Sequence, residues 1–580
     1  MLERQAEHDR LLSGELHLEK GPEDLIDSNL EHELRTPEVR QDDRPTAPAL
    51  RLSEISRPSN IVRARRSLFA RFLYAFVPQL VRTKCFNDPH SPEISHSTSW
   101  INGLRGIAAM MVFSRHYFSP FTLTTYVGYG ATSNEVWIHQ LPVFETFYDG
   151  LLGVVIFFTI SGYVCSVKPL RAMLAGDTIH RSIAIAAFGR WFRLYLPVIC
   201  SIFFIFALFR MGAMDLARPL LEDVSKYPGR APLGSVPQYP EDVRHISHWF
   251  AAVSEISNPW TIKPEPLLVY LWTIVEEFRS SMCLYMTWFV LCVCRPWTRL
   301  PVLLLLGALY AGPWQHWPPL AFFAGAALAH FDVSRTQRVE ARQNQVAGDH
   351  DLDRVNDDDA NVSPSKHRHD EPASSCASLW LRLRYLSLCI RQRLRRPYRP
   401  YVRASSRLVL YFIGLYLMSY PRQELKQPSP LYRSVVNPLI PRSYTATTGP
   451  AFPKQIGVFV FMYLLSSVPA KSRQDSLWHR GLTSGICQYL GRISFAIYIL
   501  QNAVYWVLGY ALPHLVWRQW QPSSGSWEYA VPEDFLGGLL VGWLVSFVIV
   551  MWVADVWTRE VEGRCIRFTK WLQVNVCIGK

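Results

Sequence analysis

Most apolar residues of this 580-residue chain are gathered in long runs separated by charged segments. A helix needs about 20 mostly apolar residues to cross a bilayer, where every backbone polar group must be satisfied internally. The runs therefore predict an all-α protein, a polytopic transmembrane helix bundle of about ten spans. The expected spans are 103–121, 148–167, 194–212, 267–294, 300–314, 318–332, 406–421, 455–469, 487–512 and 535–557.

Lys and Arg predict the orientation of these spans, because both are enriched in cytoplasmic loops. The net charge is +13, and the cations flank the apolar runs, so the sequence favours a membrane surface over nucleic acid as their partner. Cations precede the first span and follow the last, which predicts that both termini are cytosolic. We expect a multi-pass protein of the endoplasmic reticulum or plasma membrane. Loop 422–454 is the misfit, because its cations, Lys454 included, would lie outside.

The charged segments divide the chain into expected regions. Acidic, basic and Pro-rich sequence before residue 64 is typical of disorder, and Arg mixed with aromatic residues after it indicates a helix in the membrane interface or one packed on the bundle. The expected regions are a disordered cytosolic N-terminus (1–63), an amphipathic interfacial segment (64–97), a first membrane part (98–332), a largely disordered cytosolic insertion (333–405), a second membrane part (406–560) and a cytosolic tail (561–580).

The first span carries ionisable residues that are costly inside a membrane. Arg105 stands at its cytosolic edge, and His116 lies deeper in the same run. Eleven helical residues rise about 16 Å and return to almost the same face. One helix face would thus present a cation at the mouth and, further in, an imidazole that can remove a hydroxyl proton. The alternative is a structural His with a snorkelling Arg.

The third and fourth spans hold the other candidates. Glu276 and Arg279 are spaced to pair, which leaves Glu277 to orient a histidine or a substrate. Arg190 and Arg193, three residues apart at the cytosolic start of the third span, could clamp phosphates. The alternatives are a structural ion-pair network and a simple positive-inside signal.

Other chemistry finds no support in the sequence. The 11 cysteines are scattered without zinc spacing, so we expect neither a disulfide framework nor a metal site. The chain has no phosphate-binding loop and no nucleophile elbow or zinc-protease motif.

Taken in order, five stretches resemble the membrane acyltransferase 3 family. They are the Arg105 to His116 spacing, Phe157 to Tyr163, Arg190 to Pro197, Leu271 to Ile274 with Glu277, and Leu490 to Tyr498. The likeness covers roughly residues 98–560, and the chain looks most like fungal members of the family. Two departures stand out: Gln501 occupies a position where many relatives have His, and Glu276 adds a second carboxylate.

The resemblance implies acyl transfer from cytosolic acyl-CoA, as a co-substrate with no bound cofactor, to a hydroxyl or amine of a lipid, glycan or small metabolite. It makes His116 the general base and assigns Arg105, Glu277, Arg190, Arg193, Trp272 and Arg279 to the site. The expected partners are membrane lipids, acyl-CoA and an unidentified acceptor. Two rival hypotheses are a transporter with an intramembrane charge relay and a scaffold acting through 333–405.

Overall fold

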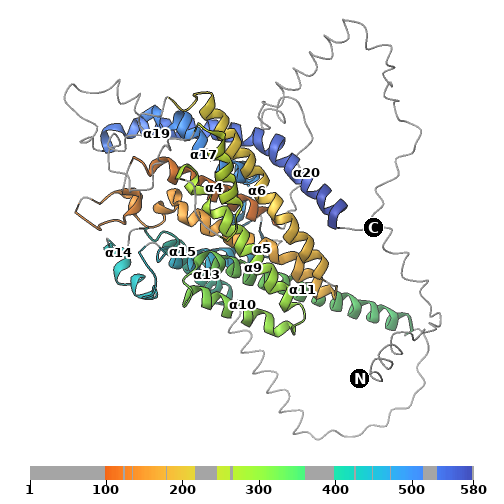
Figure 1. Cartoon of the computed structure of the whole chain (residues 1–580). Coiled ribbons are helices and arrows are strands. Elements are labelled where there is room, and N and C mark those ends of the chain that lie inside the picture. The colour runs from red at the N-terminus through yellow and green to blue at the C-terminus, as the bar shows by residue number, and fades with distance from the viewer. Residues whose placement is uncertain are drawn as a thin grey trace, which may run out of the picture. The chain divides into compact units, whose positions relative to one another are not determined.

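The computed structural model describes most of the chain after residue 97. The described residues are 98–577, with gaps at 122–123, 134, 178, 216–243, 261–265, 360–397, 423–425, 427, 447, 470–471, 474 and 514–531. The expected N-terminal regions 1–63 and 64–97 and much of the insertion therefore lie outside the described residues. The described part is all-helical and contains no strand (Figure 1).

Each predicted span falls on a helix. The main helices are α4 (Ser99–Phe118), α5 (Gly150–Ala175), α6 (His180–Arg210), α9 (Trp272–Leu291), α10 (Pro296–Ala311), α11 (Trp317–Asp359), α13 (Tyr398–Met418), α15 (Ala451–Ser466), α17 (Gly485–Val504) and α19 (Pro532–Trp557). Shorter elements among the described residues include the 3-10 helices η2 (Thr124–Tyr126), η3 (Ile138–Gln140), η4 (Phe144–Tyr148), η6 (Pro266–Leu271) and η7 (Asn437–Leu439), and α8 (Ile246–Ser257), α14 (Pro430–Arg433) and α16 (Leu477–Leu482). The π-helical η9 (Tyr505–Gly509) extends α17.

Length and hydropathy single out fewer membrane spans than the sequence predicts. Four helices in the described part are long and apolar enough to cross a membrane: Gly150–Ala175, His180–Arg210, Gly485–Pro513 and Gly537–Val576. Three shorter apolar helices cover Pro296–Ala311, Ser405–Met418 and Ala451–Ser466. A membrane protein is supported, whereas the number of ten spans stays a prediction.

Two helices extend well beyond the predicted spans. The helix α6 begins at His180, so Arg190 and Arg193 lie within it and not at its start. The helix α11 continues to Asp359, past the expected start of the insertion at 333. The α11 extension is polar, and the α6 extension has its apolar residues interrupted by Arg and Gly, so a search for continuous apolar runs finds neither.

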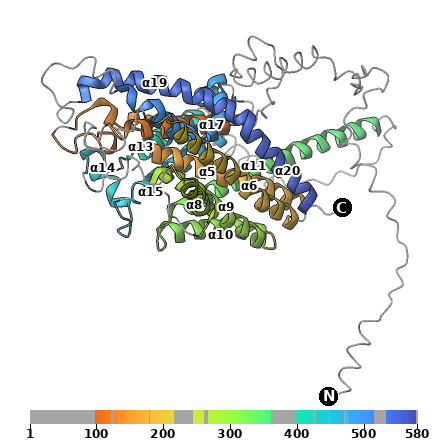
Figure 2. The same cartoon turned by 45° about the horizontal axis from the view of Figure 1, so that its top comes forward.

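The chain after α19 stays helical up to residue 577. The π-helical η11 (Thr558–Glu562), α20 (Gly563–Leu572) and the π-helical η12 (Gln573–Cys577) follow α19 directly (Figure 2). The side chain of Gln573 donates to the carbonyl of Ile185 at 2.9 Å, which attaches this end of the chain to α6.

Close glycine contacts bring α4 and α17 together. A Cβ added at Gly491 would lie 2.0 Å from the carbonyl oxygen of Asn102, so only glycine allows this approach. Further along, the Tyr505 hydroxyl donates to the backbone carbonyl of Phe113 at 2.7 Å. The Tyr510 hydroxyl donates to the backbone carbonyl of His116 at 3.1 Å. Residue numbers increase together along both helices, so α4 and α17 run parallel.

A second close pair joins α5 to α11. A Cβ at Gly325 would lie 2.0 Å from the carbonyl oxygen of Thr159, and one at Gly162 would lie 2.2 Å from that of Phe322. Small residues let neighbouring helices approach closely, and Gly162 and Gly325 do so here.

A buried ion pair changes the meaning of the misfit loop 422–454. The side chain of Lys454 is 0% exposed and pairs with Asp149, whose carboxylate also accepts from the backbone N–H of Leu152 at the start of α5. The ammonium also donates to the carbonyls of Met418 and Tyr420. Lys454 is therefore an internal partner of Asp149, not a free loop cation that reports orientation.

Candidate active site

A cavity of about 640 Å³ opens between α4, α5, α6, α9 and α17, with residues after α19 closing one side. Five cations and two carboxylates line it. They are Arg105, Lys168, Arg190, Arg193, Arg492, Glu277 and Glu562. The excess of positive over negative side chains makes this cavity suited to an anionic ligand.

One pair of charges forms a fixed network in the cavity wall. Arg190 donates to Glu277 at 2.7 Å and to the Ser281 hydroxyl at 3.1 Å. Glu277 also accepts from the Ser161 hydroxyl at 2.9 Å. The side chains of Arg190 and Glu277 are only 17% and 19% exposed, so the pair is largely shielded from water. Glu277 thus neutralises and orients Arg190, and Ser161 belongs to the site as well as to a packing motif.

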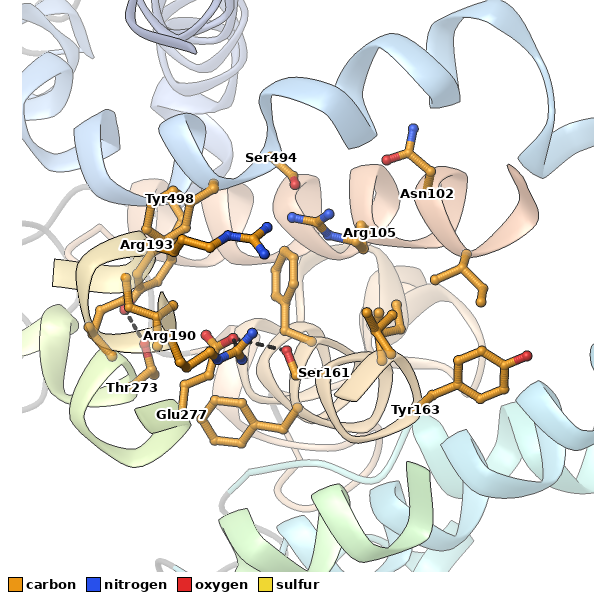
Figure 3. Close-up of a pocket in the computed structure, with 18 of the residues that line it drawn as sticks. Asn102, Arg105, Ser161, Tyr163, Arg190, Arg193, Thr273, Glu277, Ser494 and Tyr498 are labelled. Atoms are coloured by element: carbon orange, nitrogen blue, oxygen red, sulfur yellow. Dashed lines mark hydrogen bonds and ion pairs between the residues drawn. The ribbon is translucent and has the colours of Figure 1, made fainter. Parts of the chain in front are cut away.

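Two other guanidinium groups face the open space. Figure 3 shows the side chains of Arg105 from α4 and Arg193 from α6 extending toward each other across the cavity, near Ser494 of α17. No ion pair holds either of them among the residues that the structure describes. Two unpaired cations aimed into one cavity can grip a phosphate or diphosphate group without first breaking an internal bond.

The inner end of the cavity is closed by two hydroxyl side chains. Thr273 of α9 and Tyr498 of α17 line the cavity and are hydrogen-bonded to each other (Figure 3). The Tyr498 hydroxyl also reaches the backbone carbonyl of Tyr270. This Tyr498–Thr273 contact is the floor of the cavity.

The structure brings some of the predicted site residues together and separates others. Arg105, Glu277, Arg190 and Arg193 line one cavity, as the sequence-based grouping requires. His116, Trp272 and Arg279 are absent from its lining. Trp272 instead packs edge-on against Trp317, with ring centroids 5.9 Å apart.

His116 lies beyond the cavity floor. Its half-buried ring meets that of Tyr270 edge-on at 6.5 Å between centroids, and Tyr270 meets Tyr498 in the same manner at 6.1 Å. Two tyrosines therefore stand between the arginine cluster and the imidazole. Glu277 bonds Arg190 and Ser161, so the histidine partner that the sequence allowed for it is not its contact here.

Glu276 and Arg279 belong to a separate network. Arg279 pairs with Glu276 at 3.2 Å, which confirms the predicted i, i+3 pairing, and it also donates to the carbonyl of Pro259. His316, which directly precedes α11, contacts the other oxygen of Glu276 at 3.4 Å. With Glu276 only 2% exposed, this network joins α9 to the α10–α11 turn away from the cavity.

Sequence reasoning missed several lining residues. Glu562 lies past the predicted tenth span, in a region expected to be a cytosolic tail, yet it enters the cavity beside Arg105 and Arg193. Lys168 and Arg492 are spaced like ordinary positive-inside residues. Only the packing of distant helices brings these three together, and no local spacing signals it. Among the described residues, no group of three His, Cys, Asp or Glu is placed to hold a metal ion.

An all-helical bundle around a cavity with an excess of cations fits a membrane protein that binds an anionic ligand. The profile of an acyltransferase domain matches residues 98–558, and this chain belongs to the membrane acyltransferase 3 family. It is therefore an enzyme that transfers acyl groups, which argues against the carrier and scaffold hypotheses.

Named relatives come from fungi. The chain is 23% identical to acyltransferase R4 of a Phoma species over 82% of this chain and 96% of that protein. It is 22% identical to acyltransferase clz18 of Cochliobolus lunatus over 81% of this chain and 95% of that protein. It is also 26% identical to O-acetyltransferase PaAT-1 of Phomopsis amygdali, but over only 44% of this chain and 53% of that protein. No solved structure matches the chain significantly.

Proposed function

We propose that this enzyme moves an acyl group, acetyl or longer, from acyl-CoA to a hydroxyl or amine of a lipid, glycan or small metabolite. The observation that carries the proposal is the convergence of Arg105, Arg190 and Arg193 on one cavity. Coenzyme A is a polyanion, and guanidinium groups bind phosphate in a fixed bidentate geometry. A neutral acyl donor would not need this cluster.

In this proposal the arginines bind the phosphates of CoA, and Glu277 keeps Arg190 in place. The pantetheine arm then extends toward the cavity floor and carries the thioester to the depth of His116. Arg105 and His116 are separated by about 16 Å along α4. An extended pantetheine arm between the phosphates and the thioester can span a distance of that size.

His116 acts as the general base. Its neutral imidazole takes the proton from the acceptor hydroxyl as the oxygen attacks the thioester carbonyl carbon. Collapse of the tetrahedral intermediate breaks the carbon–sulfur bond, and the CoA thiolate receives the proton from the imidazolium. The ester product and CoA then leave, and no redox partner or metal is required by this balance.

The hydroxyl acceptor is favoured over the amine by one relative, which is named an O-acetyltransferase. The same name favours acetyl as the acyl group. The positive flanks of the spans support a cytosolic entrance for the donor, with both termini on that side, in the endoplasmic reticulum or plasma membrane. Membrane lipids surround the bundle and are candidate acceptors.

The test uses membranes that hold wild type or His116→Ala at matched levels, incubated with radiolabelled acetyl-CoA and a crude extract of the host. We expect label in a product only with wild type. A His116→Ala enzyme with full activity would refute the assigned base. Failure of wild type with acetyl-CoA and with longer acyl-CoA donors would refute the proposed donor.

A further inference from the structure

Gln501 of α17 is a fully buried amide without partners. Its side chain is 0% exposed, and neither its oxygen nor its nitrogen has a hydrogen-bond partner in the part of the chain that the structure describes. No other described side chain has two such atoms. A buried amide without hydrogen bonds is expensive, and native proteins rarely keep one without a reason.

The position of Gln501 links it to the cavity. Ser494 and Tyr498 line the cavity, and Gln501 follows at the spacing i, i+4, i+7, which places all three on one face of α17. One helical turn beyond Tyr498, Gln501 lies about 4.5 Å deeper along the helix axis. The cavity face of α17 therefore continues past the floor with an unpaired amide.

The parallel packing of α4 and α17 fixes the depth of Gln501 relative to the reacting groups. Gly491 contacts Asn102 near one end, and Tyr505 bonds Phe113 near the other. Gln501 falls between these contacts, at a level roughly midway between Arg105 and His116 on α4. A molecule that reaches from the arginines to the imidazole must pass it.

We propose that Gln501 binds a peptide-type amide of the pantetheine arm of acyl-CoA, an inference that rests on the proposed function. The arm carries two amides between its phosphates and its sulfur, and each offers one N–H donor and one carbonyl acceptor. A glutamine side chain with both its donor and its acceptor unpaired is the complement of such an amide. A purely aliphatic chain would leave this side chain unsatisfied.

Binding requires the floor to open. Gln501 has no exposed surface, and Tyr498, hydrogen-bonded to Thr273, stands between it and the cavity. The arm breaks the Tyr498–Thr273 hydrogen bond as it enters, and the amide of Gln501 replaces part of that lost interaction. Entry of the donor is thereby coupled to access to His116.

The test measures binding to the purified full-length protein in detergent, for CoA and for 3′-phospho-ADP, the nucleotide half that lacks the arm. In Gln501→Met, which keeps the side-chain length, we expect the Kd for CoA to rise about tenfold. Two ordinary hydrogen bonds amount to roughly 1.4 kcal/mol, which is that factor. The Kd for 3′-phospho-ADP should stay within twofold.

Thermal unfolding without ligand supplies a second readout. Gln501→Met should unfold at a higher temperature than wild type, because it removes an unsatisfied buried amide. Gln455→Met is the matched control: Gln455 is also buried, but its nitrogen donates to the carbonyl of Trp317 at 2.6 Å. This control should unfold at a lower temperature and bind both ligands as wild type does.

The possible results distinguish a failure of the role of Gln501 from a failure of the proposed function. Unchanged CoA binding by Gln501→Met, or an equal loss for both ligands, would overturn the role of Gln501 while leaving the proposed function in place. A wild type that binds neither ligand would overturn the proposed function, and the inference with it.

Discussion

The ion pair between Asp149 and Lys454 allows a quantitative test of how the bundle is held together. It joins the start of α5 to the first turn of α15, two elements far apart in the sequence, and the ammonium is fully buried. The perturbation is Lys454→Met, which keeps the length of the side chain and removes its charge. Asp149 then keeps its bond to the N–H of Leu152 but loses its counter-ion.

The expected loss is about 3–5 kcal/mol, the usual cost of leaving one charge of a buried pair uncompensated. No reduction for solvent screening applies, because Lys454 is 0% exposed and Asp149 only 9%. Asp149→Asn should cost a similar amount, since Asn can still cap α5 while the ammonium is left alone. The double variant carries neither charge and should recover much of the loss.

The assay is thermal unfolding in one detergent, followed by the fluorescence of the 20 tryptophans, for wild type, both single variants and the double variant. The reasoning requires that the double variant be less destabilised than the sum of the two single variants, by a coupling energy of several kcal/mol. Additive effects, or a Lys454→Met protein as stable as wild type, would refute it.

Three further predictions concern binding, packing and pH. Arg193→Met should weaken CoA binding about tenfold or more, as the loss of a charge-assisted hydrogen bond does, whereas Arg279→Met, outside the cavity, should bind within twofold of wild type in the same titration. Gly325→Ala should destabilise the protein by roughly 1–3 kcal/mol, because the added Cβ clashes with α5. Gly414→Ala is the control and should unfold at nearly the wild-type temperature, because its Cβ would lie at an ordinary 3.4 Å from the nearest atom. Burial and, to a lesser extent, Arg473 lower the pKa of His479, which lies outside the spans, so the folded state prefers the neutral ring. The unfolding temperature should therefore stay constant above about pH 6.5 and fall below it. In His479→Gln this fall should be less steep.

The sequence is a good guide to which segments are helical and a poor guide to how long they are. Apolar runs find the centre of each helix because burial in a membrane or a core demands them. The last part of α11, up to Asp359, is polar, and the first part of α6, from His180, mixes apolar residues with Arg, so both escape the same search. Their helicity comes from continuation of a helix already formed, which costs less than starting one.

The candidate site divides in a similar way. Arg105 and Glu277 can be selected from the sequence, because a charge within or at the edge of an apolar run needs a partner or a function. Arg190 can be selected by its spacing from Arg193. Glu562 cannot, because its place beside Arg105 depends on η11 passing the mouth of the cavity. The separation of His116 from the arginines follows from the rise of α4, but the tyrosines between them appear only when η6 and α17 are packed together.

The parallel contact between α4 and α17 has a consequence for topology that is independent of charge. If both helices cross the same membrane in the same direction, the chain between them must cross it an odd number of times. The predicted arrangement of spans meets this parity condition. Removing any one of the short apolar helices α10, α13 or α15 from the set of spans would violate it, whereas removing two together would not. A short helix therefore cannot be removed from the set of spans by itself, because the parity condition then requires that a second segment be added or removed.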